Sequence, residues 1–265
     1  MLIDTHCHLD AAEFDADRAQ VLAAARHDGV RWIVLPAVGA ENFETVARLA
    51  SSEPGCAYAL GIHPMYVDRA GDDDLRLLRE RLAAAIEDPR LVAVGEIGLD
   101  FFVPGLDRDR QERFFAEQLS MAREFELPVL LHVRRAQDVT LKHLRRIRPP
   151  AGIAHAFNGS FQQARAFLDL DFALGFGGAM TFERALQIRR LVRELPAHAH
   201  VLETDAPDIA PAWCGRARNS PAELPKIAEV FAGLRGVSLE DACEQTGRNA
   251  LRVMPRLAAL TGSAA

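Results

Sequence analysis

Short apolar runs alternate with longer stretches of helical periodicity along almost the whole chain. The runs that predict β-strands are residues 2–6, 31–37, 56–62, 91–96, 128–132, 152–155, 172–176 and 200–205. Between them, apolar residues recur at helical spacing, as in Leu75, Leu78 and Leu82, which is typical of one buried helix face. This alternation indicates parallel strands that are joined by crossover helices.

Eight such units predict an α/β fold of the (β/α)8 class, the TIM barrel. An open doubly wound sheet is the alternative, but no glycine-rich fingerprint follows the first predicted strand. Residues 221–234, 238–246 and 249–259 are expected to form the last barrel helix and a short helical tail. Because 265 residues suit one barrel and no segment resembles a linker, we expect a single domain over residues 1–265.

Composition and charge narrow the class of protein. With 49% hydrophobic and 26% charged residues the chain is typical of a globular protein, and its net charge of -6 disfavours a dedicated nucleic-acid binder. Its four cysteines are widely spaced, which indicates neither a zinc knuckle nor a disulfide framework. Free thiols, no room for a signal peptide and no membrane-length apolar run predict a cytoplasmic protein with no membrane attachment. No obligate protein partner is indicated.

Two histidines, His6 and His8, lie at and just beyond the end of the first predicted strand. Alternate residues of a strand face the same way, so both imidazoles are expected to point into the barrel mouth. Cys7, between them, is expected to face the outer helices. Two imidazoles on one side of a strand end form half of a metal site.

Other candidate ligands also end predicted strands. A carboxylate or imidazole is unexpected there in an apolar core, because a buried charge must be paired or bound to a metal. These residues, at the ends of strands four, five, six and eight, are Glu96, His132, His155 and Asp205. Barrel enzymes have their active sites at this face, so the pattern predicts a metal centre.

Four neutral histidines and two carboxylates suit two divalent metal ions per chain. Imidazole favours zinc, manganese, iron or nickel. Magnesium usually prefers oxygen ligands but remains a candidate. Two ions about 3.5–4 Å apart need a bridging carboxylate, for which Glu96 is the candidate. Two divalent ions against two carboxylates leave a formal charge of about +2, which attracts an anion such as a phosphodiester.

Seven stretches match the motifs of a known family. They are IDTHCHLD at 3–10, LGIHP at 60–64, VGEIGLDF at 94–101, PVLLHVRRA at 128–136, HAFNGS at 155–160, LETDAP at 202–207 and RNSPAEL at 218–224. In this order they resemble the TatD family of metal-dependent deoxyribonucleases, amidohydrolase-like TIM barrels, and in particular its YjjV-like branch. The resemblance implies one metal at His6, His8, Glu96 and Asp205. It implies the other at Glu96, His132 and His155.

The chain departs from this family's pattern at the barrel rim. The family commonly has Ser after the fifth-strand histidine and Asp two residues further, where this chain has Val133 and Arg135. At strand six the family often reads HCFSG, whereas residues 155–159 read HAFNG. The ligand positions match, so the departures concern the rim that meets the substrate.

Further residues are predicted to serve the reaction. His63, at the end of strand three, is a candidate to bind a phosphate or protonate a leaving group, or else a structural turn residue. Arg134 is expected to clamp a phosphate or to pair with a rim carboxylate. Glu203 is expected to face inward and orient a ligand. Glu96 and Asp205 are also predicted to be catalytic, and Asp205 is expected to accept the proton of the attacking water.

Together these features predict a divalent-metal-dependent hydrolase, a phosphodiesterase or deoxyribonuclease that uses water activated by two metals. Its expected partner is a nucleic-acid or small phosphodiester substrate. One alternative is a hydrolase of the same fold that acts on an amide, a lactone or an aminoacyl ester. Another is a decayed barrel used only for binding, which six retained ligands disfavour. The basic run at residues 142–148 is expected on the opposite face.

Overall fold

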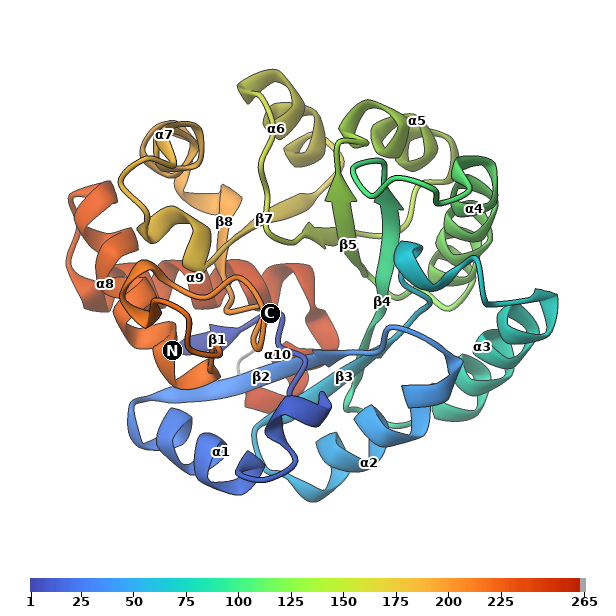
Figure 1. The fold of residues 1–265 in the computed structure, drawn as a ribbon, viewed down its shortest axis with the longest axis horizontal. Coiled ribbons are helices and arrows are strands. Elements are labelled where there is room, and N and C mark those ends of the chain that lie inside the picture. Colours follow the sequence, from blue (N-terminus) through green and yellow to red (C-terminus); the bar gives the residue numbers. More distant parts are fainter. Residues whose placement is uncertain (263–265) are drawn as a thin grey trace.

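The computed structural model describes residues 1–262 and shows eight parallel strands, each paired with the next along the chain (Figure 1). The strands are β1 (Leu2–Asp4), β2 (Val30–Pro36), β3 (Cys56–Leu60), β4 (Leu91–Asp100), β5 (Val129–Arg134), β6 (Gly152–Ala154), β7 (Phe172–Phe176) and β8 (His200–Leu202). A helix lies between each strand and the next, so the units predicted from the sequence are confirmed.

The helices form an outer ring around the strands, with two more after the last barrel unit. The α-helices are α1 (Arg18–His27), α2 (Phe43–Ser52), α3 (Asp72–Ala85), α4 (Arg108–Glu124), α5 (Gln137–Ile147), α6 (Phe161–Leu168), α7 (Leu186–Glu194), α8 (Leu224–Arg235), α9 (Leu239–Val253) and α10 (Pro255–Thr261). Short 3₁₀ helices lie in the loops: η1 (Ala12–Phe14), η2 (Ala40–Asn42), η3 (Pro64–Tyr66), η4 (Gly178–Thr181), η5 (Ala197–Ala199), η6 (Ala212–Cys214) and η7 (Pro221–Glu223).

Strands β1 and β8 are joined by hydrogen bonds just past their ends. The backbone N–H of Thr5 donates to the carbonyl of Leu202 at 3.1 Å. The buried Asp4 carboxylate accepts hydrogen bonds from the backbone N–H and the hydroxyl of Thr204. These bonds connect the first and last strands, and the predicted (β/α)8 barrel is confirmed.

Apolar side chains pack on both sides of the strands. One cluster lies between the strands and the surrounding helices. The other includes strand residues such as Ile3, Val34 and Leu130, together with Val253 and Leu257 from α9 and α10. Arg256 of α10 donates a hydrogen bond to the carbonyl of Leu91, the first residue of β4, which places these helices at the amino ends of the strands. Figure 1 shows α9 and α10 crossing one end of the ring. The amino end of the barrel is therefore sealed, and a site for a ligand must lie at the carboxyl end.

The strand boundaries differ from the predicted ones where the candidate ligands lie. Strand β4 continues to Asp100, four residues past its predicted end at Glu96. Strands β1, β6 and β8 end earlier than predicted, so His6, His155 and Asp205 follow their strands instead of ending them. The strand ends still bring all these residues to the same end of the barrel.

The predicted break in the helical tail, between residues 246 and 249, is wrong. Helix α9 runs through this segment, and the chain breaks at Met254. Pro255 explains the break, because its ring disfavours a helical conformation of the preceding residue. A glycine occupies position 247 inside α9 because a Cβ there would lie 2.3 Å from the carbonyl oxygen of Met1. In the part of the chain that the structure describes, no helix has the length and apolar character needed to cross a membrane.

Candidate metal centre

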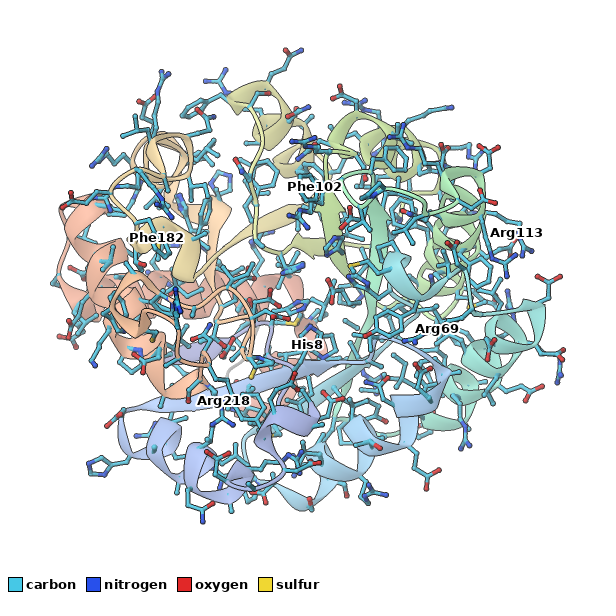
Figure 2. The ribbon with its side chains drawn as sticks, viewed as in Figure 1. His8, Arg69, Phe102, Arg113, Phe182 and Arg218 are labelled. Atoms are coloured by element: carbon cyan, nitrogen blue, oxygen red, sulfur yellow. The ribbon has the colours of Figure 1, made fainter. Side chains whose placement is uncertain are left out.

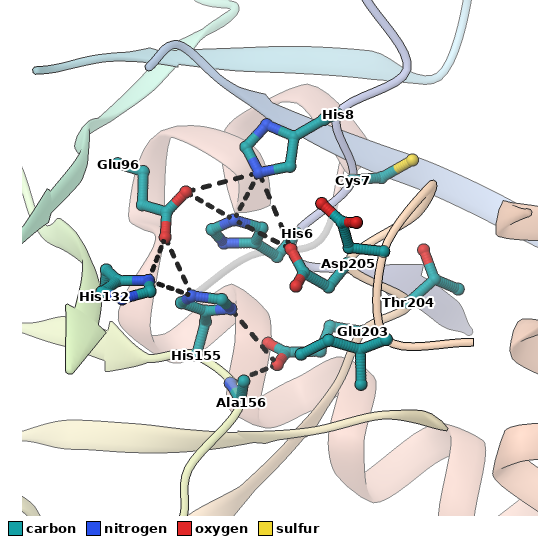
Figure 3. Close-up of polar contacts among 12 residues, drawn as sticks. His6, Cys7, His8, Glu96, His132, His155, Ala156, Glu203, Thr204 and Asp205 are labelled. Carbon is teal, nitrogen blue, oxygen red and sulfur yellow. Dashed lines mark hydrogen bonds and ion pairs between the residues drawn. The ribbon is translucent and has the colours of Figure 1, made fainter. Parts of the chain in front are cut away.

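The side chains predicted as metal ligands converge at the open end of the barrel (Figure 3). They follow β1, β6 and β8 or belong to β4 and β5: His6, His8, Glu96, His132, His155 and Asp205. Four of them are buried, and His8 and His132 are half-buried. Backbone hydrogen bonds between neighbouring segments fix them, as from Asp205 N–H to the carbonyl of His6 at 2.8 Å and from His8 N–H to that of Ala206 at 2.8 Å.

Four candidate ligand atoms lie close together around the Nε2 atoms of His6 and His8. His6 Nε2 and His8 Nε2 are 3.3 Å apart, and Glu96 Oε2 lies 3.2 and 3.3 Å from them. Asp205 Oδ1 lies 3.6 Å from both nitrogens. Ligands at 2.0–2.1 Å from a tetrahedral zinc ion are about 3.3 Å from one another. The spacing therefore fits a bound divalent cation.

The other oxygen of Glu96 faces a second group of histidines. Glu96 Oε1 lies 2.9 Å from His155 Nε2, 3.1 Å from His132 Nδ1 and 3.3 Å from His63 Nε2. His132 Nδ1 and His155 Nε2 are 3.4 Å apart. Figure 3 shows Glu96 between the two groups. One carboxylate thus serves both clusters, which is the arrangement that a bridging ligand requires.

Hydrogen bonds distinguish His63 from His132. The Nδ1 atom of His63 accepts a hydrogen bond from the backbone N–H of Met65 at 3.2 Å. In the neutral ring the proton then lies on Nε2, which makes that atom a donor and not a metal ligand. His63 is close enough to be grouped with Glu96 and His132 as a possible ligand. Its tautomer instead fits the predicted role in holding a substrate oxygen.

Asp100 is a site residue that the sequence analysis does not single out. Its Oδ2 lies 3.0 Å from His132 Nε2, and its Oδ1 accepts hydrogen bonds from the N–H groups of Phe102 and Val103 at 2.8 and 3.0 Å. Burial would raise the pKa of Asp100, but the hydrogen bonds from His132 and the two backbone groups outweigh it and lower the pKa to about 2. The ionised carboxylate holds the proton of His132 on Nε2, which leaves the Nδ1 lone pair for a metal.

A signal for Asp100 exists in the sequence. Glu96 and Asp100 are four residues apart, so they share one face if the strand continues. The predicted strand ends at Glu96 and therefore places Asp100 in a loop. In the structure, Asp100 pairs in register with Arg134 of β5.

Glu203 lies behind His155, as its predicted inward orientation requires. Its Oε1 accepts a hydrogen bond from the backbone N–H of Ala156 and lies 3.8 Å from His155 Nδ1. A Cβ at residue 175 would lie 2.0 Å from Glu203 Oε2, so the glycine there makes room for the carboxylate. Burial raises the pKa of Glu203 to about 8. That this side chain orients a metal ligand remains a prediction.

Burial and mutual charge set the protonation of the cluster. Burial lowers the pKa of His6 to about 3 and that of His63 to about 4, which keeps both rings neutral. Burial alone would raise the pKa of Glu96, but His63, His155 and His6 outweigh it and hold that pKa well below its usual range. Burial would lower the pKa of His155, yet Glu96 and Asp205 raise it to about 10. The carboxylates thus attract positive charge to the centre, either as a proton or as a cation.

The centre opens into a cavity of about 1170 Å³. Besides most of the candidate ligands, its lining includes His63, Tyr66, Phe102 and Arg134. Figure 2 shows His8 near the middle of the ring and Phe102 closer to its rim. Within residues 1–262 no carboxylate pairs with Arg134, so the alternative of a rim ion pair is not realised.

The basic run on α5 lies away from this cavity. Helix α5 begins at Gln137, which lines the cavity, and continues for 11 residues. At 1.5 Å per residue its far end lies about 15 Å along the helix axis. The basic residues, none of which lines the cavity, are Lys142, Arg145, Arg146 and Arg148. This placement agrees with the expectation that the run faces away from the metals.

Sequence comparison identifies the family. A family model described as TatD related DNase matches residues 3–255. The chain belongs to the TatD family. The resemblance inferred from the seven motifs is therefore confirmed, and the TatD match covers every candidate ligand of the centre.

Individual TatD relatives align over most of their length. The protein named uncharacterized metal-dependent hydrolase YjjV of Escherichia coli strain K12 is 39% identical over 234 residues, which cover 88% of this chain and 90% of that protein. The 3'-5' ssDNA/RNA exonuclease TatD of Klebsiella pneumoniae strain 342 is 33% identical over 259 residues, covering 94% and 95%. The crystal structure of YjjV, a TatD homologue from Escherichia coli K12, has a TM-score of 0.92 and 36% identity, covering 96% and 98%. The named relatives and the grouped ligands agree with a metal-dependent hydrolase.

Proposed function

We propose that this TatD protein hydrolyses phosphodiester bonds in nucleic acid, or in a small phosphodiester, with two divalent cations. The division of the two Glu96 oxygens between two groups of imidazoles is the observation that carries the proposal. A nuclease among the relatives, the TatD exonuclease of Klebsiella pneumoniae, supports the choice of substrate.

The donor set fits two cations. His6, His8, Asp205 and Glu96 Oε2 would hold the first, and Glu96 Oε1 with the Nδ1 of His132 and the Nε2 of His155 the second. So many imidazoles favour zinc, manganese, iron or nickel over magnesium. When bound, such ions activate a water as nucleophile and neutralise charge on the phosphate oxygens.

Asp205 would accept the proton of the attacking water. Its carboxylate lines the cavity, and burial raises its pKa, which makes it a stronger base than an exposed aspartate. The left-handed backbone at Asp205, with φ of 57°, turns the side chain toward His6 and His8. The residue can therefore take a proton without leaving the cluster.

His63 and Arg134 are placed to hold the substrate phosphate. The Nε2–H of His63 can donate to a phosphate oxygen, since the ring is neutral and its Nδ1 is occupied by Met65. Arg134 lines the cavity two residues beyond His132 and is free to bind an anion. A guanidinium suits phosphate, because its planar donors match two oxygens at once.

Cleavage assays test the proposal directly. We expect the protein to cut single-stranded DNA or a model phosphodiester with Mg²⁺ or Mn²⁺, faster with Mn²⁺ because of the imidazole ligands, and a chelator to abolish the activity. Arg134→Ala should lower kcat/KM. The decrease should correspond to a loss of about 1.5–3 kcal/mol of transition-state stabilisation, the contribution of one charge-assisted hydrogen bond. The triple variant Arg145→Ala, Arg146→Ala, Arg148→Ala is the control and should retain activity. Cleavage of esters or amides, with every phosphodiester left intact, would overturn the proposal.

A further inference from the structure

A second arginine reaches the same aromatic ring as Arg134. The guanidinium carbon of Arg134 lies 3.7 Å from the centroid of Phe102, and that of Arg135 lies 4.6 Å from it. All three side chains are exposed and line the cavity above the metal centre. Among the residues that the structure describes, neither guanidinium has a carboxylate partner. The pair therefore presents two unneutralised positive charges to the cavity.

The backbone brings the two arginines together. Consecutive residues of a strand point to opposite faces, so Arg134 and Arg135 would normally diverge. Strand β5 ends at Arg134, and Arg135 has a left-handed backbone with φ of 54°. This turn allows both side chains to reach one ring, at a conformation that is uncommon for a residue other than glycine.

The backbone of Phe102 is linked to the candidate metal centre through Asp100. The Asp100 carboxylate that contacts His132 Nε2 also accepts the hydrogen bond from the N–H of Phe102. The backbone of Phe102 is thus fixed relative to a candidate ligand, and its ring makes cation–π contacts with both guanidiniums. The arginines keep a defined position although no carboxylate binds them.

Charge is distributed unevenly around the cavity. The opposite side, near the ends of β1, β2 and β8, is lined by the carboxylates Asp10, Glu13 and Asp208, and by Glu41, which pairs with Arg69 at 3.6 Å. In a ring of eight strands in sequence order, β5 lies across from β1. An extended anion bound at the metals is therefore directed toward the arginines and away from the acidic side.

We propose that Arg135, together with Arg134 on the Phe102 ring, binds a second phosphate of the substrate, beyond the one at the metals. This rests on the proposed phosphodiesterase function and specifies its substrate as a strand with at least two phosphates. The second phosphate is either a terminal monoester or the next diester of a longer strand.

Matched substrates separate these possibilities. We compare a dinucleoside monophosphate with the same molecule carrying a 5'-phosphate, carrying a 3'-phosphate, or extended to a trinucleotide. We expect at least one of the extended substrates to be cut with kcat/KM about tenfold higher or more, as one additional charge-assisted contact provides. A preference for the monoester indicates a terminal subsite, and a preference for the trinucleotide indicates a subsite for the next diester.

Substitution of Arg135 tests whether this residue causes the preference. Arg135→Gln should reduce the preference for the extended substrate about tenfold, whereas Arg145→Gln, on the far side of α5, should leave it unchanged. Phe102→Leu should also reduce the preference, and its thermal unfolding checks that the protein folds. An unchanged preference in Arg135→Gln overturns the inference even when phosphodiesters are cut.

Binding without metal gives a readout that does not depend on catalysis. In the presence of a chelator, fluorescence anisotropy measures the affinity of labelled probes. The probes are the dinucleotide without a terminal phosphate, the same dinucleotide with the 5'- or 3'-phosphate that the cleavage assay favours, and the trinucleotide. Arg135→Gln should reduce the affinity difference about tenfold and make it less sensitive to salt. If the wild-type protein cuts no phosphodiester, the proposed function fails, while equal binding of all three probes rejects the second phosphate site itself.

Discussion

The two ends of the barrel contain different kinds of buried side chain. At the amino end, Val253 and Leu257 of α9 and α10 pack on apolar strand residues and seal the interior. At the carboxyl end, histidines and carboxylates are buried around Glu96. Apolar burial stabilises the fold without any ligand, whereas buried charges cost free energy until something compensates them. The apolar packing at the amino end, which stabilises the fold, is thus separate from the candidate metal centre at the carboxyl end.

This separation predicts that changes at one end leave the property of the other end intact. A substitution at the carboxyl end should change metal content with little loss of folding free energy. A substitution at the amino end should do the reverse. Four variants test this, in order of the expected effect.

Glu96→Ala should give the largest effect, the loss of most of both metal ions. Glu96 is the residue whose two oxygens face both groups of histidines, so its removal affects both sites. Elemental analysis of the purified protein measures the change. Glu112→Gln, which alters a carboxylate that contacts His143 of α5 away from the centre, is the control and should retain both ions. Full occupancy in Glu96→Ala would mean that the bridge is misassigned.

Leu257→Ala should destabilise the protein by about 2–5 kcal/mol, the usual cost of a cavity in a packed core. Leu257 is fully buried in the seal of the amino end. Denaturant unfolding measures the loss, and metal content per folded protein should not change. A parallel loss of bound metal in Leu257→Ala would show that the two ends are coupled.

His200 adds a pH dependence to the amino end. It begins β8 between Phe176 and Phe231, and burial lowers its pKa from the ordinary 6.5 to about 4. As pH falls below 6.5, the unfolded chain takes up a proton that the folded protein does not, so the folded state loses stability. Between pH 7.5 and 4.5 the loss is about 2–3 kcal/mol.

The variant His200→Leu should lack this component. Urea unfolding at several pH values compares it with His27→Gln, which alters an exposed histidine of α1 and keeps His200. The stability of the control should fall by about 2–3 kcal/mol more than that of His200→Leu over the same pH range. Equal pH profiles in the two variants would assign the titration to other groups.

Asp100→Asn should have the smallest effect, confined to one half of the centre. The variant keeps an oxygen for the N–H groups of Phe102 and Val103 but loses the charge that fixes His132. Loss of such a support typically weakens metal affinity 10–100-fold. Competition with a chelator should show this at the site of His132 and not at that of His6 and His8. Equal weakening at both sites contradicts the division of the centre by Glu96.

Much of this architecture can be predicted from the sequence, because apolar periodicity reports strands and helices that a barrel must bury. The ligands follow for the same reason, since a charged residue at the end of an apolar run needs a partner. The role of Asp100 depends on the true length of β4 and on its register with β5. The convergence of Arg134 and Arg135 depends on one left-handed residue, which no pattern of apolar positions encodes.

The bonds between Asp4 and Thr204 also bear on how the protein is made. Their partners are 200 residues apart in the chain. A ribosome adds about 5–20 residues per second, so the amino-terminal histidines wait about 10–40 s before Asp205 is synthesised. During that interval His6 and His8 can meet only an incomplete set of ligands. Metal is therefore expected to bind only after the last strand has been synthesised.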